Sequence, residues 1–346
     1  VQLARENKGF SHKRLRAIFD SSPLAGAGRV EDTFSLLGRA IAQLLEAAAA
    51  EGSFDAAGVA KELDVSVFSV SSVKAILDVD WREPAARATA LRTLLGQFER
   101  LRCWLEQRFD EDSLKRRPLS DHIATVEQII EQDTEPDPDR PEGDDARRLR
   151  QGVAKDRLIS LSDRDQRHGR KSSTKAFNGY KRHISVDADV QQLICAASVL
   201  PANNREYDAA KPLIKQLEGN GYIIDELHID RGYLPAEEVV DKHDAGVKVI
   251  SKPPTLRRTE YFAKDEFDVD FENETVTCPA DVVVPLRVGT IKFPRAKCQA
   301  CELLDRCTKA KSGQRSLSIH PQERWYREMA DELATKEGRE LRRERI

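Results

Sequence analysis

The stretch from Phe177 to Leu200 reads FNGYKRHISVDADVQQLICAASVL, and it sets the fold class. Within it, the runs His183–Asp187 and Leu193–Leu200 are separated by polar turn residues, which is the pattern of a β-hairpin. Helices and strands alternate after the hairpin, with a helix predicted over Asp208–Leu217, a strand over Ile223–Asp230, a helix over Pro235–His243 and a strand over Val247–Ile250. This order predicts an α/β fold whose sheet has mixed strand direction.

Upstream of the hairpin, apolar residues recur every three or four positions instead of every second position. That period predicts amphipathic helices over Val30–Ala50, Pro84–Phe109 and Leu119–Ile130, so residues 31–132 are expected to form an all-helical block. The next stretch, residues 133–150, begins with a run that is acidic, contains prolines and lacks aliphatic side chains. Such a composition buries too little surface to order itself, so we predict a linker or a solvated loop there.

Composition limits the classes of protein to which the chain can belong. Its 346 residues include 56 Lys plus Arg against 59 Asp plus Glu, which gives a net charge of −3 and excludes a wholly polybasic nucleic-acid binder. No stretch approaches the roughly 18 apolar residues of a membrane span, and no secretory leader opens the chain, so we expect a soluble, cytoplasmic protein without a membrane partner. Ser-His-Asp, phosphate-loop and dinucleotide signatures are missing, so hydrolase, kinase and dehydrogenase functions have no support.

Two aspartates follow apolar runs that read as buried strands. Asp20 follows the run Leu15–Phe19 and precedes Ser-Ser-Pro, and Asp230 follows Ile229 and precedes Arg-Gly-Tyr. Carboxylates at neighbouring strand ends repel each other, and divalent cations relieve that repulsion. Two such cations about 3.5–4 Å apart can promote phosphoryl transfer. The pair therefore predicts a two-metal site that binds Mg²⁺.

Two alternatives to this assignment stay open. Each aspartate could simply cap the following turn or helix, which is a common role for a single Asp. In addition, Asp163 and Asp165 follow another short apolar run and compete with Asp20 for the role of first carboxylate.

A basic segment over residues 166–183 contains no acidic residue. Phe177 and Tyr180 lie among its cations and could support bases or sugars. The segment is predicted to contact DNA phosphates, with a solvated loop as the alternative. The predicted phosphate ligands are Arg167, Arg170, Lys171, Lys175, Lys181 and Arg182.

Six cysteines occur, and four of them are clustered with the spacing C-x19-C-x2-C-x5-C. A two-residue gap directs two sulfurs at one tetrahedral ion, so the cluster predicts one structural Zn²⁺. Disulfides and unliganded thiols are the alternatives. The clustered residues are Cys278, Cys298, Cys301 and Cys307. Cys103 and Cys195 lie in apolar patterns and are predicted to be core thiols.

Several motifs together resemble the DDE transposases of bacterial insertion sequences, a branch of the ribonuclease-H-like polynucleotidyl transferases. The motifs are FDSSPL (19–24), FNGYKRHISVDAD (177–189), SVLPANNREYDAAKPLI (198–214), HIDRGYL (228–234) and DEFDVDFENETVTCP (265–279). The resemblance implies that Asp20 and Asp230 are the first two catalytic carboxylates and bind two Mg²⁺ ions. It also implies terminal inverted repeats, target DNA and a second protomer as partners.

The resemblance divides the chain into six parts: a first-strand region of the catalytic core (1–30), a helical insertion (31–132), an acidic linker (133–150), the main ribonuclease-H-like core (151–255), a Cys-rich, zinc-binding insertion (256–320) and the start of a late helix (321–346).

The third carboxylate of the family is a Glu four residues after an Arg. Arg345 resembles that Arg, which would place the Glu after Ile346; Glu340 and Glu344 fit the spacing poorly. Val1 is not Met, and the charged helical pattern runs to Ile346 without a stop signal, so we expect a fragment of a longer protein that binds DNA without cutting it. A non-catalytic DNA-binding remnant of a transposase and a metal-dependent nuclease are the alternative functions.

Overall fold

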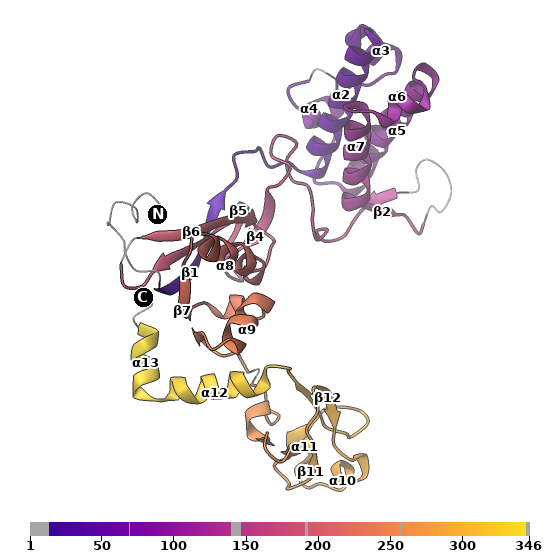
Figure 1. Cartoon of the computed structure of the whole chain (residues 1–346). Helices are drawn as coiled ribbons and strands as arrows, with labels where there is room; N and C mark the ends of the chain where they lie inside the picture. The colour runs from indigo at the N-terminus through magenta and orange to yellow at the C-terminus, as the bar shows by residue number, and fades with distance from the viewer. Residues whose placement is uncertain (1–13, 69, 140–146, 191–192, 257, 344–346) are drawn as a thin grey trace, which may run out of the picture. The chain divides into compact units, whose positions relative to one another are not determined.

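The computed structural model describes residues 14–68, 70–139, 147–190, 193–256 and 258–343 (Figure 1). The chain forms two compact units. The first comprises the residues up to Asp20, His183–Ser198 and the chain from Arg205 onward, and the second comprises Ser21–Arg182 and Val199–Asn204. Among the described residues, no helix combines the length and the apolar character that a bilayer span requires.

One six-stranded sheet contains the strands predicted from the sequence. Its order is β4 (Arg167–Arg170), β5 (Ala176–Asp187), β1 (Arg14–Ala25), β7 (Ile223–His228) and β8 (Lys248–Ile250), and β6 (Ile194–Pro201) also pairs with β5. Strands β1, β7 and β8 run parallel, whereas β4 and β5 are antiparallel. Strands β1, β5 and β6 each pass from one unit into the other. The predicted α/β class with mixed strand direction is confirmed.

The helices predicted between the later strands are also confirmed. A short 3₁₀ turn, η1 (Glu206–Ala209), leads into α8 (Ala210–Gly219), and α9 (Glu237–Asp244) precedes β8. Helix α8 buries an apolar stripe at Ala210, Leu213, Ile214 and Leu217. Strand β7 ends two residues before the predicted boundary, although the backbone N–H of Ile229 still donates to the carbonyl of Ile250 at 3.0 Å.

The prediction that the first strand ends at Asp20 is wrong. Strand β1 continues through Ser21, Ser22 and Pro23 to Ala25. Its partner explains the extension, because the N–H of Gly26 donates to the carbonyl of Asn178 in β5 at 3.1 Å. Pairing in the sheet therefore overrides the turn preference of these residues.

Gly179 in β5 is required by the close approach of β1. Its φ is +134°, and a Cβ there would lie 2.2 Å from the backbone N of Gly26 and 2.4 Å from the carbonyl O of Leu24. Backbone atoms cannot move aside as the end of a flexible side chain can. The glycine of the FNGY motif therefore has a structural role.

Gly179→Ala should lower the free energy of unfolding by about 3 kcal/mol, since it adds both φ strain and a backbone clash. Urea denaturation followed by circular dichroism measures this loss. The control is Gly96→Ala inside helix α5, where the nearest atom to a new Cβ is 3.5 Å away. That substitution should leave stability unchanged or raise it by about 0.5–1 kcal/mol. Equal losses in both variants would contradict the packing argument.

The second unit contains a helical block with its own core. Its helices are α2 (Thr33–Gly52), α3 (Ala56–Glu62), α4 (Val73–Leu77), α5 (Pro84–Arg108), α6 (Glu111–Lys115) and α7 (Leu119–Asp133). The three long helices match the prediction. Helices α3, α4 and α6 were not predicted, because they are too short to show a clear helical period of apolar residues. The Asp32 carboxylate caps α2 by accepting from the N–H groups of Phe34 and Ser35. Cys103 is exposed on α5, so its assignment as a core thiol is wrong; Cys195 is buried as predicted.

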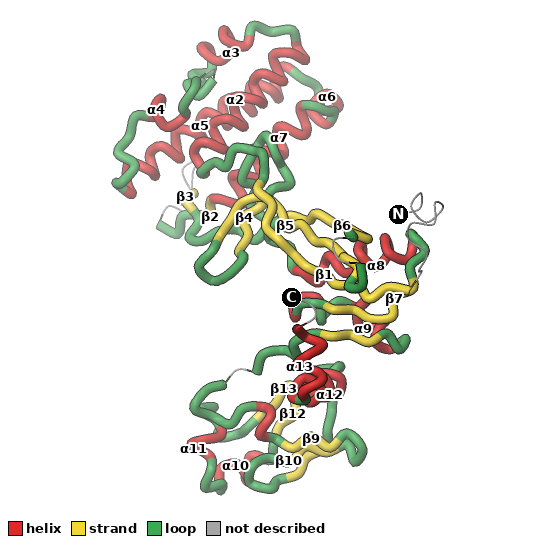
Figure 2. Tube along the Cα trace, turned by 90° about the vertical axis from the view of Figure 1, so that its left-hand side faces the viewer, coloured by secondary structure: helices red, strands yellow, loops and turns green. Residues whose placement is uncertain are grey.

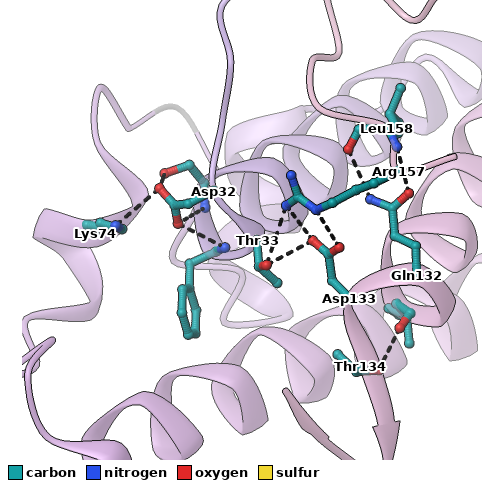
Figure 3. A network of polar contacts seen from close by, with 11 residues as sticks. Asp32, Thr33, Lys74, Gln132, Asp133, Thr134, Arg157 and Leu158 are labelled. Atoms are coloured by element: carbon teal, nitrogen blue, oxygen red, sulfur yellow. Dashed lines mark hydrogen bonds and ion pairs between the residues drawn. The ribbon is translucent and has the colours of Figure 1, made fainter. Parts of the chain in front are cut away.

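The acidic stretch is ordered at both of its ends, so the prediction of a solvated loop is wrong there. Strand β2 (Thr134–Pro136) pairs with β3 (Arg147–Leu149), and residues 140–146 lie outside the described residues. Arg157 compensates the charge at the end of α7, since its guanidinium donates to both oxygens of Asp133 at 2.7 and 2.6 Å (Figure 3). Thr33 Oγ1 also donates to this carboxylate at 2.8 Å. The Asp133–Arg157 pair is nearly buried, with side-chain exposures of 4% and 11%.

Residues 262–319, which we call the cysteine module, have a separate small core. Figure 2 shows their short strands and helices along the Cα trace. Strands β9 (Asp268–Asp270), β10 (Thr275–Thr277) and β11 (Val283–Pro285) form one sheet, and β12 (Gly289–Lys292) pairs with β13 (Ser316–Ile319). Short helices α10 (Arg295–Gln299) and α11 (Leu304–Cys307) carry cysteines. Helices α12 (Glu323–Ala334) and α13 (Lys336–Arg343) follow the module.

Candidate active site and nucleic-acid-binding segment

The parallel pairing of β1 with β7 ends two residues before each of the two predicted carboxylates. Ala17 lies opposite Leu227 and Ile18 opposite His228, where the ladder ends, and Asp20 and Asp230 each follow this last pair by two residues. Neighbouring strands are about 4.8 Å apart, which lets two carboxylates share a cation. Asp20 is exposed and Asp230 is half-buried.

Neither aspartate has the capping role that the alternative assigned to it. Asp20 lies inside a strand, where there is no turn or helix for it to cap. Asp230 precedes the 3₁₀ turn η2 (Arg231–Tyr233), but its side chain makes no capping hydrogen bond to that turn. The backbone carbonyl of Asp230 accepts from the N–H of Tyr233 instead, at 2.9 Å.

Fully buried aromatic residues support the two carboxylates from the core side. Phe19, directly before Asp20, packs edge-on against Tyr233, with ring centroids 5.7 Å apart. The hydroxyl of Tyr233 lies 2.7 Å from Nδ1 of the buried His183 on β5. Through its contacts with Phe19 and His183, Tyr233 links the HIDRGYL motif to both β1 and β5.

A charged group that the sequence analysis missed lies earlier on the same two strands. The Glu226 carboxylate accepts from Arg16 Nε at 2.8 Å and from His228 Nε2 at 3.0 Å, and Arg16 also donates to Asp189 at 2.9 Å. Burial alone would raise the pKa of the Glu226 carboxyl, but the hydrogen bonds from Arg16 and His228 outweigh it and lower that pKa. Glu226 is therefore already compensated by partners. Only the strand register, which the sequence does not reveal, would have shown this contact.

The rival aspartates lie in a different local setting. Asp163 and Asp165 lie in a loop of the second unit, Asp165 within a turn, rather than in a strand. Asp163 accepts a hydrogen bond from the hydroxyl of Tyr180, and burial together with this carboxylate raises the pKa of Tyr180 to about 12. Asp163 thus has a structural partner.

A third metal ligand is not placed beside the pair. Within the described part of the chain, no group of three or more His, Cys, Asp or Glu residues is arranged to hold a metal ion. Arg345, Glu344 and the end of the chain lie outside the described residues, and Glu340 is exposed on α13.

The basic segment forms a β-hairpin rather than a loop, since β4 pairs with the start of β5. Arg170, Lys171, Lys175 and Arg182 are exposed. Two others bond to carbonyls: Arg167 Nη1 donates to Gln166 O at 2.9 Å, and Lys181 Nζ donates to Asn204 O at 2.7 Å. Among the residues described, none of the six cations forms an ion pair with a carboxylate, so their charge is uncompensated at short range.

All four clustered cysteines line one small cavity of about 30 Å³ in the cysteine module. Burial raises the pKa of the Cys307 thiol; Arg315 opposes this effect, while Cys298, Cys278 and Cys301 add to it. All four are free thiols.

Comparison with known protein families adds a finding that is independent of this geometry. Residues 145–296 match a family model described as a transposase DDE domain, and residues 287–346 match a second model with the same description. Together the two matches span more than half of the chain; they include Asp230 and begin after Asp20. No curated protein and no solved structure matches the chain.

Proposed function

The chain belongs to the DDE transposases, and from this membership we propose that it supplies two of the carboxylates of a site that cleaves and joins DNA ends of an insertion sequence by two-metal phosphoryl transfer. The observation that supports the proposal is the β1–β7 register, whose last pair is Ile18 with His228; continued by two residues, it would align Asp20 with Asp230. These strands are separated by about 200 residues of sequence yet lie next to each other in the sheet, as a ribonuclease-H-like core requires.

Asp20 and Asp230 would hold the metal ions through their carboxylate oxygens, the ligand type that Mg²⁺ prefers. Divalent ions bound there would supply Lewis-acid stabilisation of the attacking and leaving oxygens of a phosphodiester. The chain contributes fixed positions, because the Phe19–Tyr233 contact and the His183–Tyr233 hydrogen bond hold both strands against the core. Preorganised carboxylates avoid reorganisation during the reaction.

The same proposal assigns roles to the remaining parts. The helical block would be an insertion in a ribonuclease-H-like core formed by residues 1–30 and 151–255, and residues 321–346 would begin the late helix. Terminal inverted repeats and target DNA would be the substrates. A second copy of the chain would be present in the active complex, since an element has two ends to process.

A strand-transfer assay separates this function from its alternatives. The transposase, as the cell makes it, is incubated with Mg²⁺, a labelled duplex carrying an end of its own element, and a supercoiled target plasmid. Joined products support the transposase reaction. Nicked donor without joining would indicate a metal-dependent nuclease, and binding without either product would indicate a non-catalytic remnant.

We further propose that the basic hairpin binds the DNA backbone. Lys171→Ala/Lys175→Ala should weaken duplex binding and reduce the slope of log K against log salt by roughly 0.9 for each phosphate that the variant no longer neutralises. Fluorescence anisotropy at several salt concentrations measures the slope.

The matched control is Lys211→Ala/Lys215→Ala, which removes two exposed lysines from helix α8. This control should leave the slope unchanged. If both double variants shift the slope equally, the hairpin has no specific role and only net charge matters.

A further inference from the structure

We propose that the cysteine module binds one zinc ion through Cys278, Cys298, Cys301 and Cys307. This site is separate from the carboxylate pair and does not depend on the proposed reaction. The four thiols come from separate points along the module, yet all of them line the same cavity. Convergence of four free thiols on one small cavity is the arrangement from which a tetrahedral thiolate site forms.

The backbone around Cys298 and Cys301 forms a tight turn. The N–H of Cys301 donates to the carbonyl of Cys298 at 3.2 Å, so both residues are held on one bend of the chain. The N–H of Leu303 donates to Sγ of Cys301 at 3.4 Å, which orients that sulfur. Hydrogen bonds of this kind fix the ligands of a metal site from outside.

Cys278 lies in a second tight turn, between β10 and β11. Its N–H donates to the carbonyl of Val282 at 3.0 Å, and its carbonyl accepts from the N–H of Asp281 at 2.9 Å. Asp281 adopts a positive φ of 59°, which closes the turn. The turn at Cys278 and the turn at Cys298 and Cys301 therefore both place cysteines at the cavity.

Cationic side chains supply the counter-charge that such a site needs. A zinc ion with four thiolates carries a net charge of −2, and Arg315 and Lys297 both line the cavity. Arg315 is held in place, because it donates to the carbonyls of Cys307 at 2.7 Å and Phe262 at 2.8 Å. No acidic side chain lines the cavity among the described residues.

A bound metal would also stabilise the cysteine module. Its buried apolar core is small, and Cys278, Cys298 and Cys307 pack against it. The core residues are Phe267, Val269, Val276, Val284, Ile291, Phe293, Leu317 and Ile319. Cores of this size are commonly reinforced by a metal or by disulfides. Zinc bound by the four thiols would add its binding energy to folding of the module.

The test is elemental analysis of the 346-residue chain, purified without chelators. We expect one zinc per chain in the native sequence and in Cys103→Ser, whose thiol is exposed on α5. Cys301→Ser should lower the zinc content at least tenfold. Replacement of zinc by Co²⁺ should give a thiolate-to-cobalt charge-transfer band that is absent in Cys301→Ser.

A second measurement needs no variant and so remains decisive if Cys301→Ser fails to fold. In the native chain, the four clustered cysteines should resist alkylation by N-ethylmaleimide until a chelator is added, as read by peptide mass spectrometry. Zinc-free protein whose four cysteines alkylate at once would overturn the proposal. So would disulfide-linked peptides containing these cysteines in freshly purified protein.

Discussion

Asp230→Asn should lower the rate of DNA-end cleavage by the transposase at least about 1,000-fold, and Asp20→Asn should do the same. Each substitution removes a negative oxygen ligand from the proposed metal site, and every 1.4 kcal/mol lost from transition-state stabilisation reduces the rate about tenfold. Loss of several kcal/mol is expected when a metal no longer stabilises the leaving oxygen. Single-turnover cleavage of a labelled element end in Mg²⁺ measures the rate.

Matched controls separate this catalytic effect from loss of fold. Asp225→Asn removes an exposed ion pair with Arg14 on the same strand pair, and it should leave the rate within about twofold. Asp163→Asn should change stability more than cleavage, since Asp163 accepts from Tyr180. If Asp163→Asn abolishes cleavage while Asp20→Asn does not, the first carboxylate has been assigned to the wrong residue.

Arg157→Met should have the largest effect on stability, lowering the free energy of unfolding by about 3–5 kcal/mol. The substitution leaves the Asp133 carboxylate buried and without its bidentate partner, and an uncompensated buried charge is costly. The helices α2 and α7 meet at this network through Thr33 and Asp133. Urea denaturation monitored by far-ultraviolet circular dichroism measures the loss.

The control for Arg157→Met is Arg148→Met, which breaks the ion pair between β2 and β3. Arg148 and Glu135 have side-chain exposures of 44% and 27%, so this change should cost less than about 1 kcal/mol. Adding Asp133→Asn to Arg157→Met should recover part of the loss, because it removes the unpaired charge. Equal effects of the two arginine variants would contradict the role given to burial.

The fold was predictable wherever a helix or strand was long and its apolar residues recurred with a clear period. The helices over residues 33–52, 84–108 and 119–133 and the strands from β6 to β8 all lie close to their predicted bounds. Prediction from the local sequence pattern was wrong where a residue distant in the sequence determines the local structure. Strand β1 continues past Asp20 because β5 pairs with it, and Asp133 is ordered because Arg157, 24 residues later, neutralises it.

Cys103 illustrates a different failure. Its neighbours Leu101, Trp104 and Leu105 are buried, so the local composition is apolar, but Cys103 lies on the outward face of α5. Apolar composition alone does not say which face of a helix a small residue occupies. Cys103 is two residues after the buried Leu101, which on an α-helix is the opposite face, so the helical period would have predicted that Cys103 is exposed.

The candidate site was predictable in its residues but not in its geometry. The motifs around Asp20 and Asp230 single out both carboxylates, whereas only the parallel pairing of β1 with β7, which ends two residues before each of them, bears on how close they lie. The compensation of Glu226 by Arg16 depends on the same register. Pairing between residues about 210 positions apart leaves no local signal in the sequence.

The measurement that tests the shared metal site most directly is a change of metal preference. Cysteine thiolate is a poor ligand for Mg²⁺ and a better one for the softer Mn²⁺. Asp20→Cys and Asp230→Cys should therefore be inactive in cleavage with Mg²⁺ and regain measurable activity with Mn²⁺, whereas Asp163→Cys should show no such switch. Normal cleavage by Asp20→Cys in Mg²⁺, together with a metal switch in Asp163→Cys, would contradict the pairing of Asp20 with Asp230.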